Sequence, residues 1–533
     1  KEFNLVPCKV IESNDIDSEI ILIQANAQSR ELTEVEKLTQ VERLKELYKI
    51  KKKNGEKIMR NKFVQITMEE TYTEVLSAME QRKPELIKLL EEHLDFDQLI
   101  PLSFHQTFYK RYGRTHLYHL ESILKALVLQ MLFGFSSDAQ LLLVLNCSSE
   151  LRDYCMFSKV PDASVITRFK QDYCDQIAQM FESLVELTEP ICRSINEKKA
   201  DYLIYDTTGV EPYVTENNPK FINSKLKQAK HISKKDPDFN PYKGVYSLLP
   251  ETAAVNRDIH QQYINGHYCY ALKAGILTNG LGIVRGISFF DADFKQSHPE
   301  LIGKKTTNPD LDKEIADSKS LKPVLQDFFK LHPTFSYKTF LGDSAFDSYD
   351  NYTMLKNDFL FDRVCILLNP RNCSKAGHTE FDSNGTPLCP VDKTPFLFQG
   401  ICKEKNRSDR FKWVCHKSVQ QGKTRFCTCD TPCTTSSYGR CIYTYPDKEF
   451  RLYPGVPRAT EHWDHLYGHR VVIERTITLF KDVFALDARK TYNTKTIKAN
   501  LYLSGITQLL GVLLANSLHK LQFYKSPRKL LAA

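Results

Sequence analysis

The sequence predicts an α/β protein built around a mixed β-sheet. Three observations support this fold class. Five short apolar runs between residues 202 and 368 have the length and composition of buried strands. Helical patterns separate the third run from the fourth and the fourth from the fifth. Before them, residues 60–200 repeat apolar residues at helical i, i+3, i+4 spacing. We therefore expect a helical N-terminal domain followed by a mixed-sheet core.

The predicted elements follow one another in a definite order. Helices are expected over residues 84–94, 117–132, 163–187 and 309–331, and around Glu474. Strands are expected in YLIYD, which ends at Asp206, over residues 267–278 and 282–290, in YKTFLGD, which ends at Asp343, and over residues 363–368. Asn279-Gly280 is a favourable turn between the second and third strands.

Residues 466–484 contain the most informative pattern. The spacing Tyr-x2-Arg-x3-Glu-x6-Lys is occupied by Tyr467, Arg470, Glu474 and Lys481. On an α-helix these positions fall within an arc of about 60°, beside an apolar stripe. The stripe consists of Leu466, Ile473, Ile477, Phe480 and Phe484. One helix would therefore pack on a core and present a carboxylate, two cations and a phenol. A solvated i,i+4 ion pair between Arg470 and Glu474 is the simpler alternative.

This spacing resembles the signature of bacterial insertion-sequence DDE transposases with a retroviral-integrase-like core. In that family the Glu is the third metal-binding carboxylate, and two Asp residues lie upstream on strands. Asp206 and Asp343 end predicted strands at the matching places. The resemblance covers roughly residues 60–515. It implies an RNase H-like sheet, with one Asp on the first strand and the other after the fourth.

The resemblance also implies a chemistry. Asp206, Asp343 and Glu474 would hold two Mg²⁺ (or Mn²⁺) ions for cleavage at transposon ends and strand transfer into target DNA. Arg470 and Lys481 would bind DNA phosphates, and Tyr467 would donate a hydrogen bond to phosphate.

Each carboxylate alone has a structural alternative. Asp206 could belong to a turn and Asp343 could cap the following helix. Asp201, Asp347 and Asp350 are nearby acids. They rank lower because Asp201 precedes its strand and the other two lie within a predicted helix.

Composition is ordinary for a soluble globular protein. A net charge of +8 over 533 residues is compatible with nucleic-acid binding but does not argue for it alone. Local charge is more informative. Residues 371–451 contain 14 Lys or Arg against 8 Asp or Glu, and residues 220–243 are a second basic stretch that we expect to be a loop. Either could contact a DNA backbone, although such stretches are usually solvated surfaces. The longest apolar run, residues 123–135, predicts a buried helix, so we expect no membrane association.

Nine of the 15 cysteines lie between Cys365 and Cys441. This clustering predicts a structural Zn²⁺ site that closes a small β-rich module in a basic insertion over residues 370–455. The expected ligands are Cys415, Cys427, Cys429 and Cys433, with Cys389 as the first substitute and His416 as a further candidate. Free thiols in a reducing compartment are the alternative.

Three further expectations concern DNA and the N-terminus. Trp413, in the insertion, is a candidate for stacking on an unpaired base, although core packing is commoner for Trp. Residues 59–200 resemble the transposase domain that binds transposon ends, and a helical bundle that only supports the core is equally compatible with them. Residues 1–58 resemble a partial ParB-like segment, which would be a remnant or a flexible arm.

Together these observations predict a DNA transposase whose core is divided into residues 201–369 and 456–533. Expected partners are double-stranded DNA, at transposon ends and target, and a second copy of the chain in a homodimer. The expected location is the bacterial cytoplasm, at the nucleoid. Two alternatives remain. The chain could be an RNase H-like DNA nuclease without strand transfer, or a non-catalytic DNA-binding regulator derived from a transposase.

Overall fold

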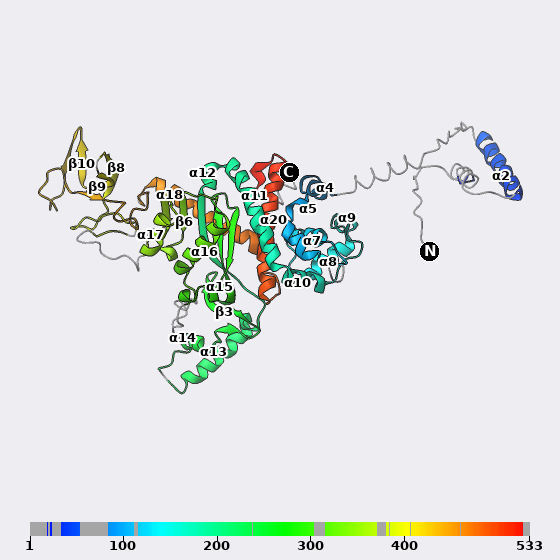
Figure 1. Ribbon diagram of the computed structural model, residues 1–533, viewed down its shortest axis with the longest axis horizontal. Coiled ribbons are helices and arrows are strands. Elements are labelled where there is room, and N and C mark those ends of the chain that lie inside the picture. The colour runs from blue at the N-terminus through cyan, green and yellow to red at the C-terminus, as the bar shows by residue number, and fades with distance from the viewer. Residues whose placement is uncertain are drawn as a thin grey trace. The chain divides into compact units, whose positions relative to one another are not determined.

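The computed structural model describes residues 34–53, 84–110, 116–236, 238–302, 315–369, 380–382, 384–405, 407–458 and 460–525, with residues 19, 22 and 23. The chain divides into two compact units, residues 1–82 and 83–533. In the first, helix α2 spans Glu34–Lys53, and most of the predicted ParB-like segment lies outside the described residues. The second unit carries every element of the candidate site (Figure 1).

A seven-stranded mixed sheet forms the framework of the second unit. Its strands are β1 (Tyr202–Val210), β2 (Thr252–Ala253), β3 (Asn256–Ile264), β4 (His267–Asn279), β5 (Val284–Phe289), β6 (Thr339–Gly342) and β7 (Arg363–Ile366). Five of them run in the order β5-β4-β1-β6-β7. β4 is antiparallel to both β1 and β5, whereas β6 is parallel to β1 and β7. β2 and β3 extend the edge beside the first half of β4. The predicted α/β class with a mixed sheet is confirmed.

Helices cover both faces of this sheet, which explains why β1 begins with the uninterrupted apolar run YLIY. On one face, α11 (Cys174–Ile195) and α20 (Thr494–Ser517) lie side by side and share a core with Ile204 of β1 (Figure 1). On the other face, α16 (Asp317–Leu331) and α17 (Tyr349–Asn357) share a second core with Tyr205. Alternation along β1 therefore sends successive side chains into different cores.

The helical region does not form a compact unit of its own. Its helices are α4 (Glu85–His93), α5 (Phe96–Leu99), α6 (Leu102–Phe108), α7 (Leu120–Phe133), α8 (Asp138–Cys147), α9 (Ser149–Tyr154), α10 (Ala163–Asp172), α11 and α12 (Glu197–Ala200). Their apolar faces join the same core as α20 and one face of the sheet. The helix predicted over residues 163–187 is two helices, because the chain leaves helical geometry at Tyr173 between α10 and α11.

Helix α20 is the main support of the core. By length and composition it could cross a membrane, and so could the pair α7 and α8 if they formed one span, but that pair is bent by 104°. The α20 segment that passes this test is 89% buried inside the protein. Its hydrophobicity is therefore used for packing against α7, α10 and α11.

The cysteine-rich region lies between β7 and α18 (Glu461–Tyr467). It contains a three-stranded sheet of β8 (Leu397–Glu404), β9 (Arg407–Val414) and β12 (Cys441–Thr444). A hairpin of β10 (Ser418–Gln421) and β11 (Thr424–Cys427) adjoins it in the sequence. Near the end of the region, the buried Arg451 guanidinium pairs with both oxygens of buried Asp347, at 2.9 and 2.5 Å. This ion pair joins the region to the core.

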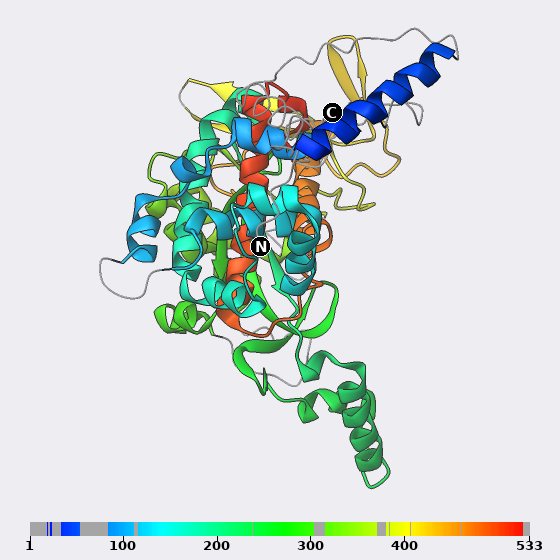
Figure 2. The same cartoon turned by 90° about the vertical axis from the view of Figure 1, so that its right-hand side faces the viewer.

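The basic stretch over residues 220–243 is largely helical, and its prediction as a loop was wrong. α13 (Pro219–Ser233) is capped by Asn218, whose side chain accepts a hydrogen bond from the Lys220 backbone N–H, and α14 (Pro241–Gly244) follows. Both helices extend away from the sheet (Figures 1 and 2). The Pro residues mark helix starts here because the first helical turn needs no N–H donor.

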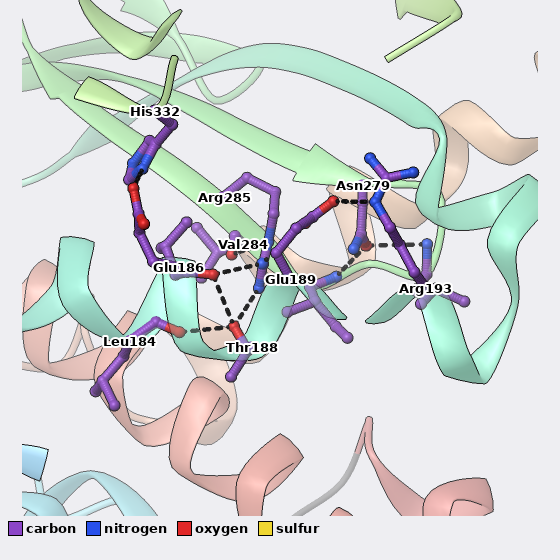
Figure 3. A network of polar contacts seen from close by, with 12 residues as sticks. Leu184, Glu186, Thr188, Glu189, Arg193, Asn279, Val284, Arg285 and His332 are labelled. Carbon is purple, nitrogen blue, oxygen red and sulfur yellow. Dashed lines mark hydrogen bonds and ion pairs between the residues drawn. The ribbon is translucent and has the colours of Figure 1, made fainter. Parts of the chain in front are cut away.

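A buried ion network ties α11 to the sheet (Figure 3). The Arg285 side chain on β5 is fully buried and donates hydrogen bonds to Val185 O at 3.0 Å and Thr188 Oγ1 at 2.9 Å. Its Nη1 lies 3.3 Å from Glu189 Oε2, and Arg193 contacts the other Glu189 oxygen at 2.9 Å. Because Arg285 has left water completely, its stability depends on this set of acceptors.

We expect Arg285→Met to lower the free energy of unfolding by about 3–5 kcal/mol, since the change removes the buried partner of Glu189 and leaves that carboxylate with only the partly exposed Arg193. The matched control is Arg193→Met, whose side chain is 35% exposed and should contribute about 1 kcal/mol or less. Urea unfolding followed by circular dichroism measures both. Equal losses in the two variants would contradict this account of the network.

Candidate active site

A polar cleft of about 650 Å³ lies where β6 ends beside the middle of β1. Its walls come from β1, the β3–β4 turn, the start of α16, the residues after β6, and α19 with the turn that follows it. The side chains that matter below are Asp206, Asp343, Glu474, Lys481, Asp317 and Lys273. The structure thus brings together three carboxylates that are 137 and 131 residues apart in sequence (343 − 206 and 474 − 343).

Asp206 lies within β1, on the face that looks towards α19. Its Oδ1 accepts a hydrogen bond from the Thr207 backbone N–H at 2.8 Å. The apolar residues that precede it on β1 are buried, so the strand holds the Asp206 carboxylate in a fixed position at the cleft. Side-chain exposure is 23%, which leaves the group accessible to a ligand.

Asp343 follows directly after β6. Its Oδ1 accepts from the Ser344 backbone N–H at 2.7 Å, so it caps the short 3-10 turn η4 (Ser344–Phe346). Asp343 therefore caps the turn that follows it, which is the structural alternative to a functional role. Only Oδ1 makes this contact, so the second oxygen of Asp343 takes no part in it. The strand predicted to end at Asp206 continues to Val210. β6 pairs in parallel with only the first residues of β1, so Asp343, directly after β6, comes beside the middle of β1, where Asp206 lies.

Glu474 is brought to the cleft by α19 (Val471–Thr478). The helix docks on the β4–β5 turn, where Thr476 Oγ1 donates to Gly282 O at 2.8 Å. Gly282 has a φ of +81°, and a Cβ there would lie 2.5 Å from Val472 Cγ1. A glycine is therefore needed both for the turn and for the close approach of α19.

The signature segment is not one regular α-helix as predicted. α18 is followed by the 3-10 turn η6 (Gly468–Arg470), by α19, and by the π-helical turn η7 (Leu479–Val483). The π turn accommodates an extra residue before Lys481, and such turns are frequent at functional sites. Ile473, Phe480 and Phe484 of the predicted stripe are fully buried.

Arg470 lies between two of the three carboxylates. Its Nη1 is 3.4 Å from Asp206 Oδ2, and its Nη2 donates to Glu474 Oε1. The predicted Arg470–Glu474 pair thus exists, but as part of a bridge to β1. Because its side chain is only 19% exposed, the guanidinium offsets repulsion between the acids more strongly than a solvated pair would.

The other two signature residues are more constrained. Lys481 Nζ donates to Gly209 O at 2.8 Å and lies 3.6 Å from Asp487 Oδ2. The Tyr467 ring stacks on Trp463 with 6.1 Å between centroids. Burial raises the pKa of Tyr467, so its hydroxyl keeps its proton and can donate a hydrogen bond.

The crowding of acids changes the pKa of Asp206. Burial, reinforced by the charges of Asp343 and Asp317, raises the pKa of Asp206 to about 6, although the Thr207 N–H and Arg470 act in the opposite direction. Because burial and neighbouring negative charges oppose ionisation of this carboxylate, a cation beside it would stabilise its ionised form. The ligand oxygens of Asp206, Asp343 and Glu474 do not all lie within 4.8 Å of one another. The three side chains nevertheless offer the oxygen donors that Mg²⁺ prefers.

Sequence analysis missed a fourth acid and a lysine of this cleft. Asp317 begins α16, accepts a hydrogen bond from Thr207 Oγ1 at 2.8 Å and lies 2.6 Å from Lys273 Nζ. An Asp in the first turn of a helix has an ordinary structural explanation, so Asp317 was not predicted as a residue of the site. A single Lys within the buried strand HYCYALKAGILT was the available signal, since a buried lysine requires a partner.

The lower-ranked acids take other positions. Asp347 is fully buried against Arg451 and also accepts from the Asn369 backbone N–H at 2.7 Å. Asp350 is an exposed residue in the first turn of α17. Asp201 precedes β1, and its carbonyl accepts from the Lys338 backbone N–H at 3.1 Å. None of the three lines the cleft.

The cysteine-rich region places most of the predicted Zn²⁺ ligands around one small core. Cys389 and Cys415 are buried in it, and Cys429 and Cys433 pack against it. Burial and the neighbouring Cys389 and Cys415 thiols raise the pKa of Cys433. Cys427, the fourth predicted ligand, lies on β11 next to Cys429. His416 lies 3.7 Å from Asp392, an acidic partner rather than a thiol. Cys389 adjoins Cys433 and Cys427 adjoins Cys429, so both are candidate ligands.

The base-stacking prediction for Trp413 was wrong for this structure. Its side chain is 1% exposed, and its Nε1 donates to Thr444 Oγ1 at 2.8 Å across the β9–β12 pair. Trp413 is the largest residue in a core that has few other apolar side chains, so packing rather than stacking explains it. Trp463, the second tryptophan, is also buried.

Comparison with known proteins points to the helical region that precedes the sheet. Residues 74–172 match the family model described as Transposase domain (DUF772), which supports a transposase. No curated protein matches the chain. Among the solved structures that match is the cryo-EM structure of the piggyBac transposase synaptic complex with hairpin DNA. That match covers 84% of each chain at 10% identity, with a TM-score of 0.24, and no argument rests on it.

The raised pKa of Asp206 predicts a pH-dependent stability. The folded protein holds the Asp206 proton more tightly than the unfolded chain, whose pKa is near the ordinary 3.8. Stability from this group is therefore lost as pH rises from about 4 through 6. Without metal, Asp206→Asn should be more stable than the wild type at pH 8 by about 1–3 kcal/mol, and the difference should shrink at pH 4.5.

Thermal unfolding in EDTA at both pH values measures this difference. Asp350→Asn, a change at an exposed acid nearby, is the matched control. Its effect on stability should be small and equal at the two pH values. An Asp206→Asn variant that is less stable than the wild type at pH 8 would show that the Arg470 bridge outweighs the cost of ionising Asp206.

Proposed function

We propose that this protein is a DDE transposase that cuts DNA at transposon ends and joins them to target DNA. One observation carries the proposal: Asp206, Asp343 and Glu474, on three separate elements, line a single cleft together with Lys481. A structural account of each residue alone does not explain why all three converge.

The sheet supports the proposal. The strand order β5-β4-β1-β6-β7, with β4 antiparallel to its neighbours, is the order expected of an RNase H-like core. Asp206 lies on the first strand of that core and Asp343 follows its fourth. The transposase-domain match to residues 74–172 lies in the helices that precede this sheet and pack on it.

In the proposed mechanism, Asp206, Asp343 and Glu474 would hold two Mg²⁺ or Mn²⁺ ions. The chemistry that these ions supply when bound is activation of a water or 3′-hydroxyl and stabilisation of the leaving oxygen. Arg470 now contacts Asp206 and Glu474. Its planar guanidinium reaches the cleft and could hold a DNA phosphate bidentately.

Further DNA contacts follow from the charge distribution. Lys220, Lys227, Lys230, Lys234 and Lys235 are exposed along and just after α13. This helix extends away from the sheet that carries the cleft (Figure 2). We assign it to contacts with the DNA backbone, which need cationic side chains but no sequence-specific geometry.

The central prediction concerns Asp343. Asp343→Ala should abolish cleavage and strand transfer in Mg²⁺ while binding of the same DNA remains within a few-fold, because the change removes a metal ligand and no DNA contact. The substrate is a linear donor that carries the genomic sequences flanking the coding region, and products are resolved on denaturing gels. Asp350→Ala, seven residues further on, is the matched control and should cleave normally.

Other outcomes identify the alternatives. Cleavage of the donor without joined products would favour a DNA nuclease. Binding of the donor without cleavage in the wild type, in Mg²⁺ and in Mn²⁺, would favour a DNA-binding regulator. An Asp343→Ala variant that cleaves like the wild type would overturn the assignment of the site.

We also propose that the cysteine-rich region holds a structural Zn²⁺ ion, with Cys389, Cys415, Cys429 and Cys433 as its ligands. Support comes from the gathering of these thiols around one core, two of them buried. Burial and the nearby Cys427 and Cys415 thiols raise the pKa of Cys429 to about 11. Without metal the Cys429 thiol therefore keeps its proton, which Zn²⁺ would replace.

Removing these thiols should remove zinc. We expect the triple change Cys415→Ser, Cys429→Ser, Cys433→Ser to lose about one Zn²⁺ per chain by elemental analysis and to increase proteolysis of residues 380–458, since a structural site supplies folding energy. Cys402→Ser and Cys441→Ser, at partly exposed cysteines of the same region, are the controls. Unchanged zinc content in the triple variant would leave the cysteines as ordinary thiols.

A further inference from the structure

A second group of possible metal ligands lies beside the cleft but does not belong to it. Glu211, His267 and Cys269 each present one ligand atom, and these three atoms all lie within 4.8 Å of one another. Among the described residues it is the one group of three or more His, Cys, Asp or Glu that gathers so closely. The His267 Nε2 to Glu211 Oε2 distance is 3.1 Å.

The sheet register explains why these side chains meet. Val210 pairs with Leu272 across β1 and β4, so the next residue, Glu211, comes opposite Ala271. His267, Cys269 and Ala271 are two residues apart along β4 and share one face of it. Two of the ligands therefore lie on one face of β4, and the third follows directly after its partner strand β1.

The surroundings orient the group as a metal site requires. Asn265 Nδ2 donates to Glu211 Oε1 at 2.9 Å, and the Asn265 side chain also bonds both N–H and C=O of Gly209. Asn265 and Gly266 have φ of +58° and +81° and form the β3–β4 turn. The carboxylate is thus held by a neighbouring amide, as metal-binding carboxylates usually are.

The three side chains differ in their exposure to solvent. The Cys269 thiol is 6% exposed, the Glu211 side chain 28% and the His267 side chain 55%. The sulfur lies at the bottom and the imidazole at the surface, so an ion could enter from solvent and keep one position open to water. A carboxylate and a thiolate would together neutralise a divalent ion.

We propose that Glu211, His267 and Cys269 form a second metal site, selective for Zn²⁺ or a similar borderline-soft divalent ion. Sulfur and imidazole donors favour such an ion over Mg²⁺, which prefers oxygen. The site is separate from the three carboxylates of the cleft and from the cysteine-rich region.

The position of the site indicates what it does. Asn265 and Gly266 line the catalytic cleft, as do Tyr263 and Ile264 before them. An ion held by Glu211 and by the start of β4 would fasten this turn to the end of β1, the strand that carries Asp206. The proposed ion therefore fixes one wall of the cleft. This inference does not require that the protein be a transposase.

The test uses full-length protein freed of metal and titrated with Co²⁺, whose thiolate charge-transfer and d–d absorption report sulfur ligation. His267→Gln and Cys269→Ala should each lose about one equivalent of bound Co²⁺, and Cys269→Ala should also lose part of the charge-transfer band. His231→Gln on α13 and Cys174→Ala on α11 are matched controls, and both should retain the wild-type stoichiometry. Circular dichroism establishes that each variant is folded.

A second arm tests the supporting amide. Asn265→Gly keeps the positive φ of the turn but removes the hydrogen bond to Glu211, and should weaken metal binding by about 10–100-fold. Zn²⁺ should raise the thermal midpoint of the wild type more than that of His267→Gln. Wild-type stoichiometry and spectrum in both His267→Gln and Cys269→Ala would overturn the proposal and leave His267 and Glu211 as an ion pair. Because the readout is metal content, this failure would not bear on DNA cleavage.

Discussion

Repulsion between carboxylates is the constraint on which the rest of this structure depends. Asp206, Asp343 and Glu474 lie around one cleft, and Asp317 lies close enough for its charge to add to theirs. Such a group stays together only if something compensates for its charge. Here Arg470 contacts two of the acids, and Lys273 pairs with the fourth. Arg470 and Lys273 therefore reduce the repulsion that would otherwise keep these acids apart.

The framework resists the same repulsion mechanically. β1 is hydrogen-bonded on both sides, to β4 and β6, and both of its faces are covered by helices. α19 is fixed by its contact with the Gly282 turn, and α11 by the buried Arg285 network. Each acid is therefore attached to an element that cannot retreat without breaking a buried contact, which is how strain at a site is maintained by the remainder of a fold.

Local sequence determined much of this outcome. The strands that carry Asp206 and Asp343 were predictable because apolar runs of that length have few other uses, and Glu474 because its neighbours repeat with helical period. The features that could not be predicted depend on contacts between residues that are distant in sequence. Asp317 matters only because α16 begins opposite Thr207. Trp413 is buried only because β12 pairs with β9. The break at Tyr173 and the helix α13 show that local patterns leave helix boundaries open.

Strand β1 links the two proposed metal sites. Asp206 lies within β1, and Glu211 follows directly after its last residue. Asp206 shares its cleft with Asp343 and Glu474, which are oxygen donors. Glu211 meets His267 and Cys269, which add nitrogen and sulfur. Because the two donor sets share no residue, the proposed ions would be selected independently by chemistry. They would still be coupled mechanically, since both would be bound to the same strand.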